Sequence, residues 1–290
     1  MNTTLSTATE FREQLETNLR AYSISTGESL QRLRQKVASD RFLARIFYRE
    51  PSSFALKGGY AMELRITQAR ATKDIDLTSS IRVVDTTEPM TEVILQQLQT
   101  LANINLFDHF TFQIGQPQRD IENAPYGGSR HSISVLVDNR PFANFHLDIG
   151  CDFLVDQVEE ISGTNWLEFC GIAPPIISMI SVEQQFAEKL HSYTLPREQI
   201  NTRTKDLIDL ILLLNLRDQT PEVFLNALQR IFRARNTHLL PATIPKPPES
   251  WSKPFAAMAT ECGISSNLAE GFTKVSDFFD RIQSVVRDNN

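Results

Sequence analysis

The amino-acid sequence predicts an α+β fold, in which a mixed sheet with flanking helices is followed by an all-helical C-terminal domain. Apolar and polar residues alternate, as in half-buried strands, at 109–114, 131–137 and 142–149. After Gly171 the strand signals stop, and apolar residues recur at helical spacing. We therefore expect two domains, residues 1–171 and residues 172–290.

Two helices are expected within residues 8–50. In the first, Phe11, Leu15 and Leu19 recur every four residues, which is the spacing of one helix face. The second, at about 27–49, carries six basic side chains that we expect on a solvated face. These side chains are Arg32, Arg34, Lys36, Arg41, Arg45 and Arg49.

The next part of the chain predicts a strand, a tight turn and a short helix, at Phe54–Lys57, Gly58-Gly59 and Tyr60–Ile66. Asp74–Thr78 then alternates between polar and apolar residues, which predicts a second strand.

Met90–Ala102 has the apolar spacing of an amphipathic helix, and 109–114 alternates as a strand. The segments 131–137 and 142–149 are joined by Asp138-Asn139-Arg140-Pro141, which is rich in turn-forming residues. This arrangement predicts a β-hairpin.

The C-terminal part predicts five helices, with a proline-rich connection between the third and the fourth. Their expected ranges are Val182–Thr194, Thr204–Leu216, Pro221–Ala234, Pro254–Glu261 and Asn267–Arg287.

Composition narrows the class of protein. The net charge of -6 argues against a general nucleic-acid binder, so any RNA contact needs a local basic patch. The three cysteines are far apart, which argues against a disulfide framework or a zinc site. The most apolar window, Ile172–Val182, is too short to span a membrane, and the N-terminus has no signal-peptide pattern. We therefore expect a cytoplasmic protein without a membrane partner.

Asp74 and Asp76 are the first candidate metal ligands. Two residues apart on a strand, they project from the same face, while Ile75 and Leu77 point into the core. Paired carboxylates repel each other unless a cation lies between them, and Mg²⁺ prefers such oxygens. The alternative is an ordinary half-exposed edge strand.

A phosphate site is expected just upstream, because a strand that turns through Gly58 and Gly59 into a helix lets backbone N–H groups approach an anion. The spacing is neither that of a Walker A loop nor that of a Rossmann motif. Asp148, at the end of a later strand, is the candidate third carboxylate, and Asp152 is its alternative. Either could instead cap a turn.

Two later helices carry further charged candidates. Lys189 lies on the flank of the apolar stripe of its helix, where a lysine can reach a phosphate or simply extend its charge to solvent. Asp206 and Asp209 begin a helix that is apolar nearly all round. Buried carboxylates need a cationic partner or a ligand.

Three motifs in order resemble one family. They are Leu56-Lys57-Gly58-Gly59 with Arg70-x-Thr72-x-Asp74-Ile75-Asp76-Leu77, Ala187-Glu188-Lys189-Leu190-His191, and Arg203-x-Lys205-Asp206-Leu207-x-Asp209-Leu210. Over about Phe54–Leu214 the chain resembles the AbiEii-type nucleotidyltransferase toxins of bacterial toxin–antitoxin and abortive-infection systems. This family belongs to the polymerase-β-like nucleotidyltransferase superfamily, so the resemblance implies that superfamily's mixed sheet.

The resemblance implies an NTP substrate and Mg²⁺, expected as two ions, on Asp74, Asp76 and Asp148. Gly58 and Gly59 would bind the β- and γ-phosphates, helped by Lys57 or Arg70. Lys189 would neutralise triphosphate charge, and Asp209 with Asp206 would position it. Many superfamily members have serine where this chain has Gly59, so backbone amides or Tyr60 would have to replace one phosphate ligand.

The expected acceptor is RNA, in particular a tRNA 3′ end, with growth arrest as the outcome and an antitoxin encoded nearby. Arg230, Arg233 and Arg235 form a basic segment that would fit RNA, although it would equally suit a helix C-terminus. Two rival functions are nucleotidylation of a protein hydroxyl and nucleotide-dependent regulation without turnover.

Overall fold

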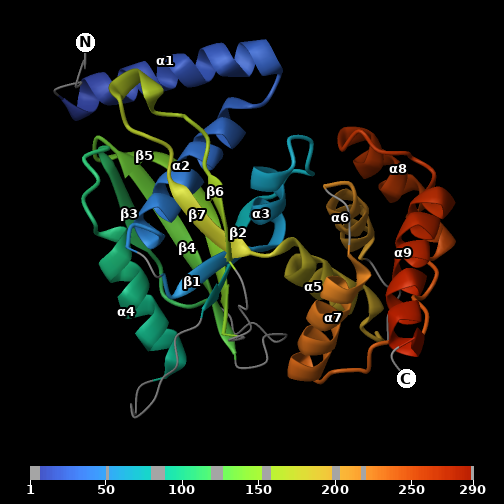
Figure 1. The fold of residues 1–290 in the computed structure, drawn as a ribbon. Coiled ribbons are helices and arrows are strands. Elements are labelled where there is room, and N and C mark those ends of the chain that lie inside the picture. Colours follow the sequence, from blue (N-terminus) through green and yellow to red (C-terminus); the bar gives the residue numbers. More distant parts are fainter. Residues whose placement is uncertain are drawn as a thin grey trace. The chain divides into compact units, whose positions relative to one another are not determined.

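The computed structural model describes residues 7–49, 52–79, 89–118, 127–151, 158–197, 203–216 and 220–288. Figure 1 labels its helices and strands. The strands are β1 (Phe54–Lys57), β2 (Asp74–Ser79), β3 (Phe110–Ile114), β4 (Gly128–Val137), β5 (Arg140–Gly150), β6 (Val158–Ser162) and β7 (Ile176–Ile180). The α-helices are α1 (Ala8–Thr26), α2 (Leu30–Ile46), α3 (Gly58–Arg65), α4 (Met90–Ala102), α5 (Val182–Thr194), α6 (Thr204–Leu214), α7 (Pro221–Arg235), α8 (Ser252–Glu261) and α9 (Leu268–Asp288).

Contacts between Cα atoms divide the chain into two compact units. Unit 1 comprises Met1–Tyr60 and Lys73–Met179, and unit 2 comprises Ala61–Thr72 and Ile180–Asn290. The segment Ala61–Thr72, which separates the glycine turn from β2, therefore belongs with the helical C-terminal part. The expected domain boundary after residue 171 stays a prediction.

Unit 1 is built on a mixed seven-stranded sheet in the order β3-β4-β5-β2-β1-β7-β6. β2 runs antiparallel to β1 and parallel to β5, and β4 and β5 form an antiparallel hairpin. The hairpin turn is Asp138-Asn139, with φ angles of 54° and 56°, as a two-residue turn of this kind requires. The predicted hairpin is confirmed, but its turn is two residues shorter than expected, because Arg140 and Pro141 already belong to β5.

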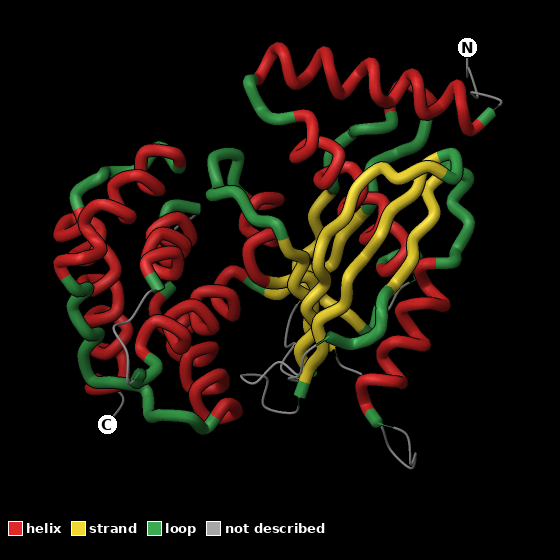
Figure 2. The backbone as a smooth tube through the Cα atoms, turned by 180° about the vertical axis from the view of Figure 1, so that it is seen from behind, coloured by secondary structure: helices red, strands yellow, loops and turns green. Residues whose placement is uncertain are grey.

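Helices α2 and α4 pack beside each other on one face of the sheet, against β5 and β3 respectively (Figure 1). Phe42 of α2 joins this core, with its ring 5.4 Å from that of Phe112 and 5.7 Å from that of Phe145. Seen from behind, the strands lie in front of α2 and α4 (Figure 2). The opposite face of the sheet is the one that carries the candidate site.

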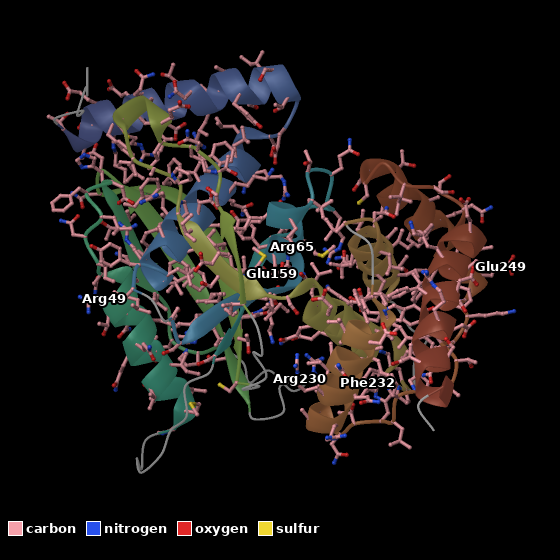
Figure 3. The ribbon with its side chains drawn as sticks, in the orientation of Figure 1. Arg49, Arg65, Glu159, Arg230, Phe232 and Glu249 are labelled. Carbon is pink, nitrogen blue, oxygen red and sulfur yellow. The ribbon has the colours of Figure 1, made fainter. Side chains whose placement is uncertain are left out.

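The basic face of α2 is only partly solvated. Arg49 (labelled in Figure 3) lies beyond the end of α2 and is exposed, whereas Arg41 and Arg45 are buried and both bind Asp108. Arg45 places two nitrogens on the two Asp108 oxygens, at 2.9 and 2.6 Å. The expectation of one solvated face was therefore wrong for these two arginines, because a buried carboxylate compensates their charges.

The expectation that no strand follows Gly171 was wrong, because β7 (Ile176–Ile180) does. β7 pairs with β1 in parallel, and its residues Ile177, Met179 and Ile180 are buried. A strand buried on both sides has no polar–apolar alternation, which is why its sequence did not indicate a strand. β6, at the edge of the sheet, is short and polar, and it also went unpredicted.

In unit 2, helices α5, α6, α7 and α9 pack on one another. Phe186, Phe224 and Phe278 meet edge to face, with ring centroids 5.0 to 5.7 Å apart. Arg65 (labelled in Figure 3), at the end of α3, donates hydrogen bonds to the Ile180 carbonyl and to the Gln185 side chain. The five predicted helices are all present, with ends within two residues of those expected for all of them.

Candidate active site

Four charged residues lie in one row across four adjacent strands. Lys57 of β1 pairs with Asp76 of β2, Asp76 pairs with Asp148 of β5, and Asp148 pairs with Arg130 of β4. Directly opposite residues project from the same face of a sheet. The row therefore has two carboxylates in the middle and a cation at each end.

The carboxylate face is opposite to the core face, as the sequence predicts. Ile75 and Leu77 are 1% and 0% exposed, whereas the side chains of Asp74 and Asp148 are 37% and 20% exposed. Asp74 lies on β2 two residues before Asp76 and pairs with His146 of β5. Nδ1 of His146 is 3.6 Å from Oδ1 of Asp74. The structure thus brings Asp74, Asp76 and Asp148 onto one face from two neighbouring strands.

Arg130 holds Asp148 with both arms of its guanidinium group. Its Nε and Nη2 donate to the two Asp148 oxygens, each at 2.6 Å, and Nη2 also lies 3.4 Å from Asp74 Oδ2. This hydrogen bonding, first of all to Asp148, raises the pKa of Arg130 above its ordinary value, so the side chain is a permanent cation.

Asp76 lies against the start of α3. Gly58 has a φ angle of +68°, and a Cβ added there would lie 2.0 Å from Oδ2 of Asp76. Only glycine leaves room for the carboxylate in this backbone conformation. The glycine pair was expected to form a turn before the helix, but α3 begins at Gly58 itself. Its first turn adjoins an acidic side chain of the site.

Tyr60 anchors this first turn on α2. Its hydroxyl donates to Asp40 Oδ1 at 2.7 Å, and the Thr164 N–H donates to Asp40 Oδ2 at 2.9 Å. Burial raises the pKa of Asp40 to about 6, against the opposing effect of these hydrogen bonds. The tyrosine hydroxyl thus has a structural partner within unit 1.

A second charged cluster lies within unit 2. Asp209 of α6 is 0% exposed and binds Arg70 through both oxygens, at 2.9 and 2.8 Å. Lys189 Nζ lies 2.7 Å from Asp209 and 3.5 Å from Asp206, which also binds Arg203. The structure therefore brings together four predicted residues: Arg70, Lys189, Asp206 and Asp209.

The ionised states of this cluster support one another. Burial alone would favour neutral Lys189, but Asp209 and then Asp206 outweigh it, so the pKa of Lys189 is raised. Burial would likewise favour protonated Asp209, but Lys189 and Arg70 outweigh it, so the pKa of Asp209 is lowered. Each charge thus has an opposite charge beside it in unit 2.

The basic segment at the end of α7 is mostly turned inward. Arg235 Nη2 lies 3.2 Å from Glu188, and Nη1 lies 3.4 Å from Nδ1 of His191. Arg230 (labelled in Figure 3) is half-buried, and Arg233 is exposed. Of the three arginines predicted to contact RNA, Arg233 is the one that projects most freely.

The donor chemistry of unit 1 fits a hard divalent cation, because Asp74, Asp76 and Asp148 offer only oxygen ligands. In the part of the chain that the structure describes, however, no three His, Cys, Asp or Glu side chains are already arranged as a metal cage. Asp148 and Asp74 are instead engaged by Arg130. Asp152, the alternative to Asp148, lies outside the described residues.

Comparison with known proteins identifies the family. The model of the AbiEii nucleotidyltransferase toxin of type IV toxin–antitoxin systems matches residues 41–281. The chain belongs to the AbiEii nucleotidyltransferase toxin family. The family implies an NTP substrate, usually a divalent metal, and a cognate antitoxin. No curated protein sequence matches the chain significantly.

One solved structure supports the fold. The MenT4 nucleotidyltransferase toxin of Mycobacterium tuberculosis is similar over 93% of this chain and 89% of its own, with a TM-score of 0.60 and 14% identity. JHP933 from Helicobacter pylori is similar over 90% of this chain and 95% of its own, with a TM-score of 0.48 and 15% identity. The similarity to MenT4 agrees with a nucleotidyltransferase fold in this AbiEii-family chain.

The pairing of Arg130 with Asp148 does not follow from the sequence pattern, and the hairpin explains why. A four-residue turn at 138–141 would place His131 opposite Asp148. The observed two-residue turn alone would place Ser129 opposite Asp148, and the register shift between Val135 and Leu136 moves the pairing back by one position. Together they place Arg130 opposite Asp148, a pairing that the residue pattern alone does not indicate.

Proposed function

We propose that this AbiEii-family enzyme transfers a nucleotide from an NTP to an acceptor hydroxyl of RNA, most specifically at a tRNA 3′ end, and thereby arrests growth. The observation that carries the proposal is the set of three carboxylates, Asp74, Asp76 and Asp148, on one sheet face beside the glycine start of α3. Growth arrest and the RNA acceptor follow from the family resemblance, and a cytoplasmic location is part of the same proposal.

Each candidate site residue of unit 1 has a role in this proposal. Asp74, Asp76 and Asp148 would hold Mg²⁺, which when bound neutralises triphosphate charge and stabilises the leaving pyrophosphate. Gly58 and Gly59 would offer backbone N–H groups at the N-terminus of α3 to the β- and γ-phosphates. Lys57, next to Asp76 in the row, would add a positive charge on the same face.

The predicted roles of unit 2 remain part of the proposal. Lys189 and Arg70 would contribute positive charge toward the triphosphate, and Asp209 with Asp206 would hold these cations in place. Their mutual contacts support the positioning role of Asp209, because Asp209 binds both Lys189 and Arg70.

None of the described helices is long and apolar enough to cross a membrane.

The acceptor is tested by incubating the purified enzyme with α-phosphate-labelled NTPs and either total RNA or total protein. We expect label on RNA of tRNA size, released by digestion of the 3′ end. Asp76→Asn should abolish labelling, because the negative charge and one of the two metal-binding oxygens are lost. Asp280→Asn, which removes an exposed carboxylate of α9, is the control and should label like wild type.

Two other results would redirect the proposal. Label on protein with none on RNA would identify a protein hydroxyl as the acceptor. If neither is labelled, and Asp74→Ala and Asp76→Ala variants still arrest growth, the chain acts as a nucleotide-binding regulator without turnover.

A further inference from the structure

We propose that Arg130 is a displaceable internal counter-ion of the active site, which holds Asp148 and Asp74 before divalent metal binds and afterwards binds a phosphate group of the NTP. This inference rests on the proposed function and adds to it a substrate-binding residue that the sequence motifs do not include.

The charge balance of the sheet face supports a counter-ion. Asp74, Asp76 and Asp148 lie on neighbouring strands, and ionised carboxylates this close repel one another unless a cation intervenes. Arg130 supplies that cation, with two hydrogen bonds of 2.6 Å to Asp148 and a contact of 3.4 Å to Asp74. It thus contacts two of the three predicted metal ligands.

Exposure indicates that the pair can exchange. The side chains of Arg130 and Asp148 are 32% and 20% exposed, whereas the similar fork of Arg45 on Asp108 is 2% and 1% exposed. Separating a buried pair leaves uncompensated charges, but water can reach both partners of a partly exposed pair. The Arg45 pair is therefore structural, and the Arg130 pair is poised to be replaced.

The geometry also gives Arg130 a second partner. It projects from β4 on the same face as the carboxylates and belongs to the row that ends at Lys57. A guanidinium group that leaves Asp148 stays within one side-chain length of it. Its planar fork matches phosphate oxygens as well as carboxylate oxygens. Arg130 would thus exchange a carboxylate for a phosphate when metal and nucleotide bind.

Two substitutions separate the clamp, which is the two-armed hydrogen bonding of Arg130 to Asp148, from the positive charge of Arg130. Arg130→Lys keeps the positive charge but loses the two-armed fork, and Arg130→Gln loses both. Arg140→Gln is the control, because Arg140 lies at the start of β5 in the same hairpin, its side chain is 55% exposed, and its only ion pair in the described structure is with the nearby Asp138.

The first measurement is Mn²⁺ binding in the absence of nucleotide. Electron paramagnetic resonance of the free ion monitors this binding. We expect Arg130→Lys to bind Mn²⁺ roughly three- to tenfold more tightly than wild type, because a weaker competitor holds Asp148. Arg130→Gln should bind at least as tightly as Arg130→Lys, and Arg140→Gln should equal wild type. If Arg130→Lys equals wild type, the clamp does not compete with metal and the proposal fails.

The second measurement is binding of α,β-methylene NTPs at saturating Mn²⁺, using all four bases. We expect Arg130→Gln to weaken this binding by about tenfold, with Arg130→Lys in between. Unchanged binding in Arg130→Gln would contradict the phosphate role. If wild type binds neither Mn²⁺ nor any analogue, the proposed function fails as well, whereas normal wild-type binding with unaffected variants counts against Arg130 alone.

Discussion

Gly58 is a single residue on which the geometry of the site depends. Its φ angle is +68°, and the space that a Cβ would need is taken by the carboxylate of Asp76. Gly27 offers a comparison, because its φ angle is +75° and nothing lies within 4 Å of a Cβ added there. The two glycines share the backbone requirement and differ in the neighbouring side chain.

Replacing each glycine by alanine separates these two causes. Gly27→Ala should lower the free energy of unfolding by about 1 kcal/mol, the cost of a left-handed alanine. Gly58→Ala should cost roughly 1 to 3 kcal/mol more, because Asp76 must also move. Urea denaturation measures both. Equal losses would mean that Asp76 does not restrict position 58.

Asp40 adds a pH dependence to stability. Its pKa is raised by burial from 3.8 to about 6, so the folded protein holds this proton more tightly than the unfolded chain. The stability that it contributes is complete below pH 3.8 and is lost as the pH rises through about 6.

The variant Asp40→Asn removes this titration. Relative to the variant, wild type should gain roughly 1 to 2 kcal/mol in free energy of unfolding between pH 8 and pH 5. Urea denaturation of both proteins at the two pH values measures the gain. A difference that does not change with pH would contradict the raised pKa.

Among the elements, α6 combines an apolar surface with two acidic residues that behave differently. Both are buried, but Asp209 is shared by the largely buried Arg70 and Lys189, whereas Asp206 binds Arg203, whose side chain is 41% exposed. The sequence predicts a buried helix whose carboxylates need partners. It does not identify Arg70 as a partner, because Arg70 is 139 positions away from Asp209.

Asp209→Asn should destabilise the protein by about 3 to 5 kcal/mol, because two largely buried cations lose their shared carboxylate. Asp206→Asn should cost only about 1 kcal/mol, since water can solvate Arg203. Thermal or urea unfolding compares the two variants. A similar loss in both would show that the burial of the cations bound to Asp209 does not determine its contribution.

The hairpin β4–β5 marks the limit of element prediction. Alternation of residues identifies both strands, and the turn residues place the hairpin within two positions. The residue that faces Asp148 depends on the exact turn length and on the shift at Val135/Leu136, and both arise from backbone geometry. For this reason Asp148 could be predicted from the sequence, but Arg130 could not.

At the scale of the whole molecule, the sequence predicts the fold class and the family correctly but not how the segments group. β7 follows two prolines and completes the sheet beside β1, although it lies after the expected end of the strand region. Ala61–Thr72, between the two site motifs of unit 1, groups with unit 2. These groupings depend on long-range contacts, which local periodicity does not encode.

The central claim is that the carboxylates of β2 and β5 in this AbiEii-family protein support transfer of a nucleotide. The most direct test compares NTP labelled on the α-phosphate with NTP labelled on the γ-phosphate, using total RNA as the acceptor. Wild type should place the α label on RNA and release the γ label in pyrophosphate, and folded Asp76→Asn should do neither. Transfer of the γ label, or equal α labelling by Asp76→Asn, would contradict the claim.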